Sequence, residues 1–168
     1  MKSLHYVSEL ERLGLTFSVN RFESSSKLEL AQSLSRMNSR SPDVLVLILQ
    51  MCIDFELKSY TLWDETLNGM AKMCMVKELG KFLPKLSTAT HAVGCNGYIR
   101  GWEVLIWEPF RRTDALLSQK QYDDCLTSIC LLHSCPVARK LNMKQIIKIC
   151  FQSHHPELAA ALLPFLSK

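Results

Sequence analysis

The apolar run from Val44 to Ile53, interrupted only by Gln50, restricts the possible folds more than any other feature of the sequence. Such a run can be a membrane span, a buried strand or a buried helix. It is shorter than the roughly 18 apolar residues that a membrane helix needs. No other stretch of the chain reaches that length either, so we expect no membrane span.

The residues that precede the run favour a helix. Ser41 is placed to cap free N–H groups, Pro42 suits the first helical position, and Asp43 complements the positive end of the helix dipole. The apolar pattern continues to Leu57, which is long for a strand and ordinary for a helix. A helix that is apolar on nearly every side must be covered on nearly every side. We therefore expect it at the centre of the fold, or with one face against another part of a larger assembly.

The remaining sequence repeats the same helical signals. Only six glycines and six prolines occur in 168 residues, which favours long helices with few connections. Ser26 to Glu29 has the pattern of a capping box, and Ser118 and Asn142 are predicted caps. Pro84 and Pro109 are predicted to kink or end their helices. The predicted helices cover residues 26–37, 42–57, 61–73, 75–86, 98–107, 118–132, 142–151 and 155–165.

These helices predict an all-α fold, specifically an irregular α-solenoid segment of about nine antiparallel helices, with a compact bundle as the alternative. We expect residues 1–168 to form a single unit. A subdivision is possible at residues 88–97, TATHAVGCNG, which look like a linker because of Gly94 and Gly97. The end of the chain, ALLPFLSK, is apolar almost to its last residue, so we expect a fragment of a longer protein.

Charge and cysteine content narrow the class of protein. The net charge is +4, and the basic residues are scattered along the chain, with Arg111 and Arg112 side by side. A direct nucleic-acid interface needs basic residues on one face, so we do not expect one. Seven cysteines are present, and Glu9, Glu11 and Arg12 lie where a secretory signal would be apolar. A reducing, cytoplasmic compartment is therefore expected.

The candidate chemical motifs do not converge on an active site. Cys125 and Cys130, like Cys130 and Cys135, are five residues apart, whereas zinc sites favour a separation of two to four, and His133 does not complete a set. Buried cysteines on a packing helix explain this cluster better. The glycines of GYIRG, residues 97–101, lack a phosphate-binding lysine and a preceding strand. We predict no enzyme, no metal site and no cofactor.

Four residues near the predicted 98–107 helix are the candidate partner-binding residues. Tryptophan and arginine are the commonest residues at interface hot spots. Trp102 and Trp107 are five residues apart, so they face different sides of a helix, and Arg111 and Arg112 follow. One tryptophan is expected in the core and the other at the surface. The alternative is that both tryptophans are buried and both arginines are simply solvated.

Three segments resemble the C-terminal region of the Rod (rough deal) family of kinetochore proteins. They are RMNSRSPDVLVLILQMCIDFEL, GYIRGWEVLIWEPF and CPVARKLNMKQIIKICFQSHHPELAAALLPFL. The resemblance is strong over the first segment, moderate over the others, and runs from about Leu28 to the end. It contains no catalytic motif.

This resemblance implies a scaffold. Rod proteins carry a β-propeller followed by a long α-solenoid, and they assemble with Zw10 and Zwilch on unattached kinetochores. The assembly recruits Spindly with dynein–dynactin, and it supports Mad1–Mad2 in the spindle assembly checkpoint. The expected location is the kinetochore and spindle in mitosis and the cytoplasm otherwise. The resemblance covers only the helical C-terminal region, so a partial gene model, a splice product and a paralogue all stay possible.

Two other functions remain as alternatives. Irregular α-solenoids also occur in membrane-traffic tethers, and Zw10 is shared with such a tether. A small helical enzyme or a nucleic-acid binder is the third possibility, and it would need a cleft with perturbed acids or a focused basic patch.

Overall fold

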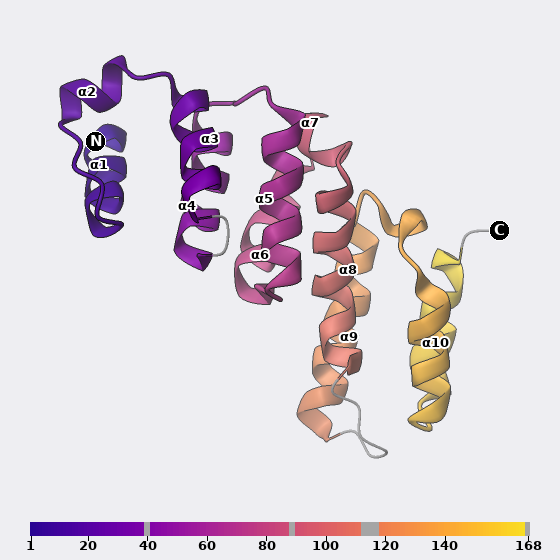
Figure 1. Ribbon diagram of the computed structural model, residues 1–168. Helices are drawn as coiled ribbons and strands as arrows, with labels where there is room; N and C mark the ends of the chain where they lie inside the picture. The colour runs from indigo at the N-terminus through magenta and orange to yellow at the C-terminus, as the bar shows by residue number, and fades with distance from the viewer. Residues whose placement is uncertain (39–40, 88–89, 112–117, 167–168) are drawn as a thin grey trace.

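The computed structural model describes residues 1–38, 41–87, 90–111 and 118–166, and all regular secondary structure within these ranges is helical (Figure 1). The predicted all-α class is confirmed. The helices are α1 (Lys2–Arg12), α2 (Val19–Ser24), α3 (Lys27–Asn38), α4 (Pro42–Asp54), α5 (Tyr60–Lys72), α6 (Val76–Phe82), α7 (Thr90–Val93), α8 (Asn96–Arg111), α9 (Gln119–Ser134), α10 (Met143–Gln152) and α11 (Pro156–Leu162), with short 3₁₀ helices η1 (Leu83–Leu86), η2 (Ala138–Lys140) and η3 (Leu163–Phe165).

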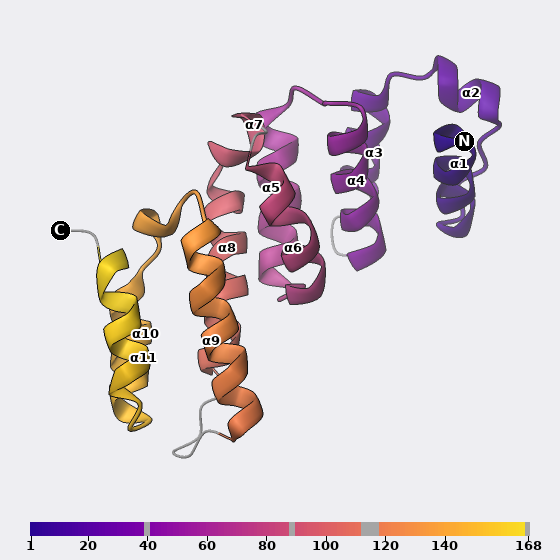
Figure 2. The same cartoon turned by 180° about the vertical axis from the view of Figure 1, so that it is seen from behind.

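The helices lie side by side in one row, with the two ends of the chain at opposite ends of the row (Figure 1). Helices α5, α8 and α10 are in front in Figure 1, whereas α6, α9 and α11 are in front in the reverse view of Figure 2. Contacts join α3 to α5, α5 to α8 and α8 to α10 in one layer, and α9 to α11 in the other. This two-layered row is the arrangement expected of an irregular α-solenoid.

Helix α4 confirms the helical interpretation of the apolar run. Pro42 occupies its first turn, and Asp43 is the acidic residue near its positive end. Ser41 is the N-cap residue as predicted, although its side chain makes no capping hydrogen bond among the described residues. The helix contacts α3 and α5 on its two sides. Its buried residues are Val44, Leu45, Leu47, Ile48, Leu49, Met51 and Cys52.

Two further helix starts follow their predicted caps. At the start of α9, Ser118 Oγ accepts from the N–H of Gln121 at 3.3 Å, and the Gln121 side chain accepts from the N–H of Ser118 at 2.9 Å. At the start of α3, Ser26 Oγ accepts from the N–H of Glu29 at 3.3 Å. These bonds satisfy backbone donors that have no partner inside a helix.

Two predicted boundaries are wrong. Helix α8 continues through Pro109 to Arg111. A proline in the last turn removes only one hydrogen bond, the one that would reach the carbonyl of Leu105, so the helix can absorb it. The predicted linker, residues 88–97, contains α7 and the start of α8. Its apolar residues Ala92 and Cys95 are fully buried, which is consistent with the packing of α7 against α5. A subdivision of the chain there stays a prediction.

Two glycines of α8 allow its neighbours to come close. A Cβ atom on Gly97 would lie 2.6 Å from the backbone oxygen of Asp64 and 2.9 Å from the backbone nitrogen of Asn68, both in α5. A Cβ atom on Gly101 would lie 3.2 Å from Leu79 Cδ2 of α6. The motif GYIRG is therefore a helix-packing motif: a side chain at Gly97 would overlap the backbone of α5, and one at Gly101 would require the tips of Leu79 and Leu83 to shift slightly.

Within the described ranges, no helix is both long and apolar enough to cross a membrane.

Candidate interaction surface

Trp102 lies in the core and not on a surface. Its side chain is 0% exposed, and its ring meets the Tyr98 ring edge-on with the centroids 6.3 Å apart. A side chain with no exposed area offers nothing to a partner in this conformation. Trp102 is thus the tryptophan expected in the core, and partner binding by it stays a prediction.

Trp107 and Arg111 lie at the surface near the C-terminal end of α8. Trp107 is half-buried, and its indole N–H is buried without a hydrogen-bond acceptor in the part of the chain that the structure describes. Arg111 is exposed and is the last residue of α8. Arg112 lies outside the described residues. Partner binding by Trp107 and Arg111 stays a prediction.

The cysteine cluster of α9 does not form a common site. Cys125 and Cys135 are buried, whereas Cys130 is exposed, and the His133 ring packs edge-on against Phe165 at 5.0 Å. Burial raises the pKa of both Cys125 and Cys135 to about 11, so these thiols remain protonated at neutral pH. No group of three or more His, Cys, Asp or Glu side chains in the described ranges could hold a metal ion.

The two adjacent histidines belong to the turn before α11. His154 has a positive φ of 59°, and His155 is the N-cap residue of the helix, without a side-chain capping bond. His155 Nδ1 lies 2.7 Å from Glu157 Oε1, and this hydrogen bond lowers the pKa of the exposed Glu157 carboxyl. The His155 ring also packs against Tyr122, with the centroids 5.3 Å apart. These contacts place the histidines in local structure and not in a cleft.

A groove between α3, α5 and α8 brings together charged residues from three helices, and we call it the basic groove. Its volume is about 700 Å³. Arg36 comes from α3, Lys72 from α5 and Arg100 from α8, and all three side chains are exposed. The same groove is lined by Asp64, Glu65 and Asn68 of α5.

Hydrogen bonds already occupy part of the basic groove. Asp64 Oδ1 accepts from the N–H of Gly97 at 2.7 Å, and Asp64 Oδ2 accepts from Asn68 Nδ2 at 3.0 Å. Asn68 Oδ1 in turn accepts from Arg100 Nη1 at 3.4 Å. Burial raises the pKa of Glu103, and a hydrogen bond with the backbone of Asn142 and then the charge of Arg100 partly offset that rise. The Asp64 carboxylate is therefore used to connect α5 to α8.

A second groove, of about 310 Å³, lies between α1, α4 and α6, and we call it the balanced groove. Here Arg12 Nη2 is 2.9 Å from Glu9 Oε2 and 3.8 Å from Asp43 Oδ2. Lys77 and Lys81 of α6 line the same groove. Its opposite charges are partly paired within the chain, in contrast to those of the basic groove.

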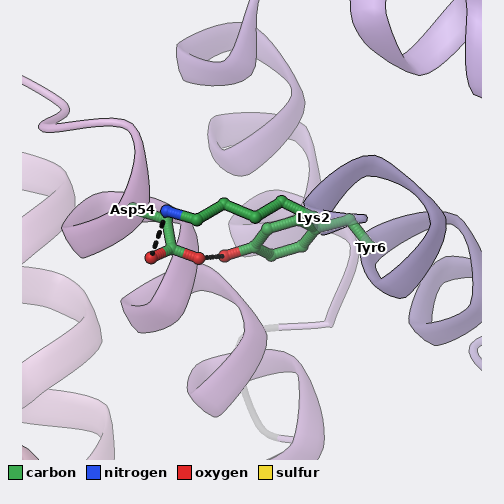
Figure 3. Close-up of polar contacts among 3 residues, drawn as sticks. All are labelled: Lys2, Tyr6 and Asp54. Carbon is green, nitrogen blue, oxygen red and sulfur yellow. Dashed lines mark hydrogen bonds and ion pairs between the residues drawn. The ribbon is translucent and has the colours of Figure 1, made fainter.

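The joint between α1–α2 and α4 is held by long polar side chains. Tyr6 Oη donates to Asp54 Oδ2 at 2.8 Å, and Lys2 Nζ lies 3.3 Å from Asp54 Oδ1 (Figure 3). The Tyr6 ring stacks on Phe22 at 5.6 Å and packs against Phe55 at 5.4 Å. Burial, and then the hydrogen bond to Asp54, raise the pKa of the Tyr6 hydroxyl, so it remains a donor well above neutral pH.

Lys27 adds a cationic contact to this joint. Its ammonium lies 4.6 Å from the centroid of the Phe22 ring and 5.7 Å from that of Phe55. It also donates to the backbone oxygens of Phe22, Glu23 and Ser25, at the C-terminal end of α2. The cation therefore satisfies carbonyls that have no partner inside α2 and covers the aromatic cluster at the same time.

The comparison with known protein families decides the ancestry of this row of helices. All of residues 1–168 match the family model described as the Rough deal protein C-terminal region. The chain belongs to this family. The match includes the residues before Leu28, to which the sequence resemblance did not extend.

Two relatives with the same name illustrate the similarity. Kinetochore-associated protein 1 of Mus musculus is 22% identical over 166 residues, which is 99% of this chain and 8% of the relative. Kinetochore-associated protein 1 of Homo sapiens is 22% identical over 163 residues, which is 97% of this chain and 7% of the relative. The chain thus spans less than a tenth of the length of these relatives.

Proposed function

We propose that this chain is a non-enzymatic scaffold segment of a Rod-like kinetochore protein. The observation that carries the proposal is the match of the whole chain to the Rough deal C-terminal region, whose curated relatives are named as kinetochore-associated proteins. The row of stacked helices supports it, because such rows offer extended surfaces to other proteins. The helices would act through surface complementarity and would carry out no chemistry.

The proposed partners are Zw10 and Zwilch. Through them the chain would act in the spindle assembly checkpoint, with indirect links to Spindly, dynein–dynactin and Mad1–Mad2. The proposed location is the kinetochore and spindle in mitosis and the cytoplasm otherwise. Trp107 and Arg111, at the C-terminal end of α8, belong to the proposed contact surface because one offers a half-buried ring and the other an exposed guanidinium.

The test is recovery of Zw10 and Zwilch on the tagged chain from extracts of mitotically arrested and interphase cells. We expect Zw10 and Zwilch from the mitotic extract. The variant Arg111→Glu should reduce that recovery, whereas Arg139→Glu, which makes the same charge change at an exposed residue of η2, should not. Circular dichroism of both variants checks that they are folded.

Two outcomes would contradict the proposal. Recovery of Zw10 with subunits of a membrane-traffic tether, only from interphase extract, would favour the tether function. Recovery of neither protein on a folded chain would mean that the ancestry does not bring the scaffold function with it.

A further inference from the structure

We propose that the basic groove binds an acidic, extended segment of a partner protein. The inference deepens the proposed scaffold function and rests on it for the view that the chain binds proteins. The first observation is the convergence of Arg36, Lys72 and Arg100, which come from three different helices, on one groove of about 700 Å³. Within the described ranges, no carboxylate lies within ion-pairing distance of any of these three cations.

The two acidic residues of the groove, Asp64 and Glu65, are fewer than its three cations, and they form no ion pair with them among the described residues. Asp64 accepts hydrogen bonds from the N–H of Gly97 and from the side-chain amide of Asn68. The first of these bonds connects α5 to α8. Glu65 is then the one lining carboxylate of the groove that has neither a hydrogen bond nor an ion pair among the described residues. Three cations therefore face two carboxylates, and the one positive charge in excess favours a ligand of negative charge.

The balanced groove is an internal comparison. Its arginine, Arg12, already lies within 4 Å of two carboxylates of the chain, those of Glu9 and Asp43. An acidic ligand would have to compete with these ion pairs. Both grooves belong to the same chain, so its overall net charge acts on both. The difference in charge pairing between them comes from the residues that line each groove.

The walls of the basic groove indicate the form of the ligand. A smaller groove of about 180 Å³ adjoins it and shares Ser35, Arg36 and Glu65. The extension adds the side chains of Gln32, Ser59 and Thr61, which are donors and acceptors of hydrogen bonds. Such walls suit the exposed backbone of an extended peptide. An amphipathic helix would instead need a broad apolar floor.

The test uses the purified chain and a defined probe. The probe is a fluorescein-labelled peptide of Glu, Ser and Gly residues, and the comparison peptide has Gln in place of every Glu. Fluorescence anisotropy at low and at physiological salt gives the two affinities. We expect tighter binding of the Glu peptide, with an affinity that falls as salt rises.

Two charge-matched variants locate the binding site. The double variant Arg36→Glu with Lys72→Glu changes two exposed groove residues, and Lys144→Glu with Lys148→Glu makes the same charge change at exposed positions of α10. We expect the groove variant to weaken binding of the Glu peptide at least about tenfold, and the α10 variant to change it less than about twofold. Circular dichroism checks the folding of both variants.

Three results would overturn the proposal. The first is equal binding of the Glu and Gln peptides, and the second is an equal loss in the two variants, which would mean a general charge effect. The third is displacement of the Glu peptide by a single-stranded oligonucleotide that itself binds more tightly, which would favour nucleic acid. Because no other protein is present, failure here leaves recovery of Zw10 from mitotic extract as an independent result, and the reverse also holds.

Discussion

The two best-defined joints of the row are built in opposite ways. Between α5 and α8 the backbones approach so closely that Gly97 has no room for a single methyl group. Between α1–α2 and α4, by contrast, the helices are connected by the tips of large side chains, namely the Tyr6 hydroxyl, the Lys2 ammonium and the carboxylate of Asp54 (Figure 3). The α5–α8 joint requires a residue without a side chain at Gly97, whereas the joint between α1–α2 and α4 requires the polar groups of Tyr6, Lys2 and Asp54.

The difference teaches what each joint can tolerate. A backbone contact fails when volume is added, because the helices must separate along their whole length. A joint made by side-chain tips fails when a polar partner is removed, because a buried donor or acceptor then loses its hydrogen bond. An added methyl group should therefore weaken the α5–α8 joint, and the removal of a polar group should weaken the joint between α1–α2 and α4.

The largest effect is expected from Gly97→Ala. The new Cβ atom would overlap backbone atoms of Asp64 and Asn68, so we expect a loss of about 3 kcal/mol in the free energy of unfolding, measured by urea denaturation. Gly80→Ala is the matched control in α6, because its Cβ atom would lie 3.4 Å from Leu105 Cδ1. That variant should be neutral or more stable by about 0.5 to 1 kcal/mol. Similar stability of both variants would contradict the close α5–α8 contact.

Alkaline pH should destabilise the fold through its buried thiols and phenols, among them Cys52 of α4 and Tyr6 of the joint between α1–α2 and α4. Burial raises the pKa of Cys52 to about 12 from an ordinary value of 9.0, and burial also raises that of Tyr6 from 10.0. The folded chain therefore retains protons that the unfolded chain releases above pH 9, and the free energy of unfolding should fall from there to about pH 12. Each retained proton costs about 1.4 kcal/mol per pH unit.

Thermal unfolding between pH 7 and pH 11 checks this prediction. Cys52→Ala should reduce the slope of melting temperature against pH, whereas the exposed Cys74 serves as a control, since Cys74→Ala should leave the slope unchanged. A melting temperature that does not change above pH 9 would mean that these groups are not buried.

A smaller effect is expected from Tyr6→Phe. The variant keeps the stacked ring and removes the donor to Asp54, so a loss of about 1.5 kcal/mol is expected. Hydrogen exchange should become faster in α1 and α2 while α5 and α8 stay protected. Tyr60→Phe, whose hydroxyl is part of a half-exposed side chain, should change stability by less than about 0.5 kcal/mol. Equal loss of protection in α8 would show that the two joints open together.

The smallest effect is expected from Lys27→Met. Methionine keeps the apolar contact with Phe22 and Phe55 but loses the cation and its bonds to the end of α2. We expect a loss of about 0.5 to 1 kcal/mol by urea denaturation. The exposed Lys58 provides the control, and Lys58→Met should leave stability unchanged. An equal loss in both variants would point to a general charge effect.

Local sequence signals predicted most of the helices from α3 onward, but they did not predict α1, α2 or α7. Ser41, Pro42 and Asp43 identified the start of α4, and Ser118 identified the start of α9, because caps and dipole partners act within one turn. The prediction that Pro109 ends its helix was wrong, because the effect of a proline depends on its position. In the last turn it removes only one backbone hydrogen bond.

Contacts between helices could not be predicted in the same way. The spacing of Gly97 and Gly101 was visible in the sequence, but only the neighbouring α5 and α6 reveal that it serves helix packing. Arg36, Lys72 and Arg100 looked scattered because they lie on three separate helices, and only the order of the row brings them together. Trp102 was a reasonable surface candidate in the sequence, and only the structure shows that its side chain is buried.

The side-chain joint at α1–α2 also has a mechanical consequence. Because the helices form a single row, a pull applied along it loads every joint in series with the same force (Figure 1). The contact that relies on a few hydrogen bonds and rings, around Tyr6 and Lys27, should yield before the interlocked backbones at Gly97. The row would then lengthen stepwise from its N-terminal end, with α5 and α8 acting as its rigid centre.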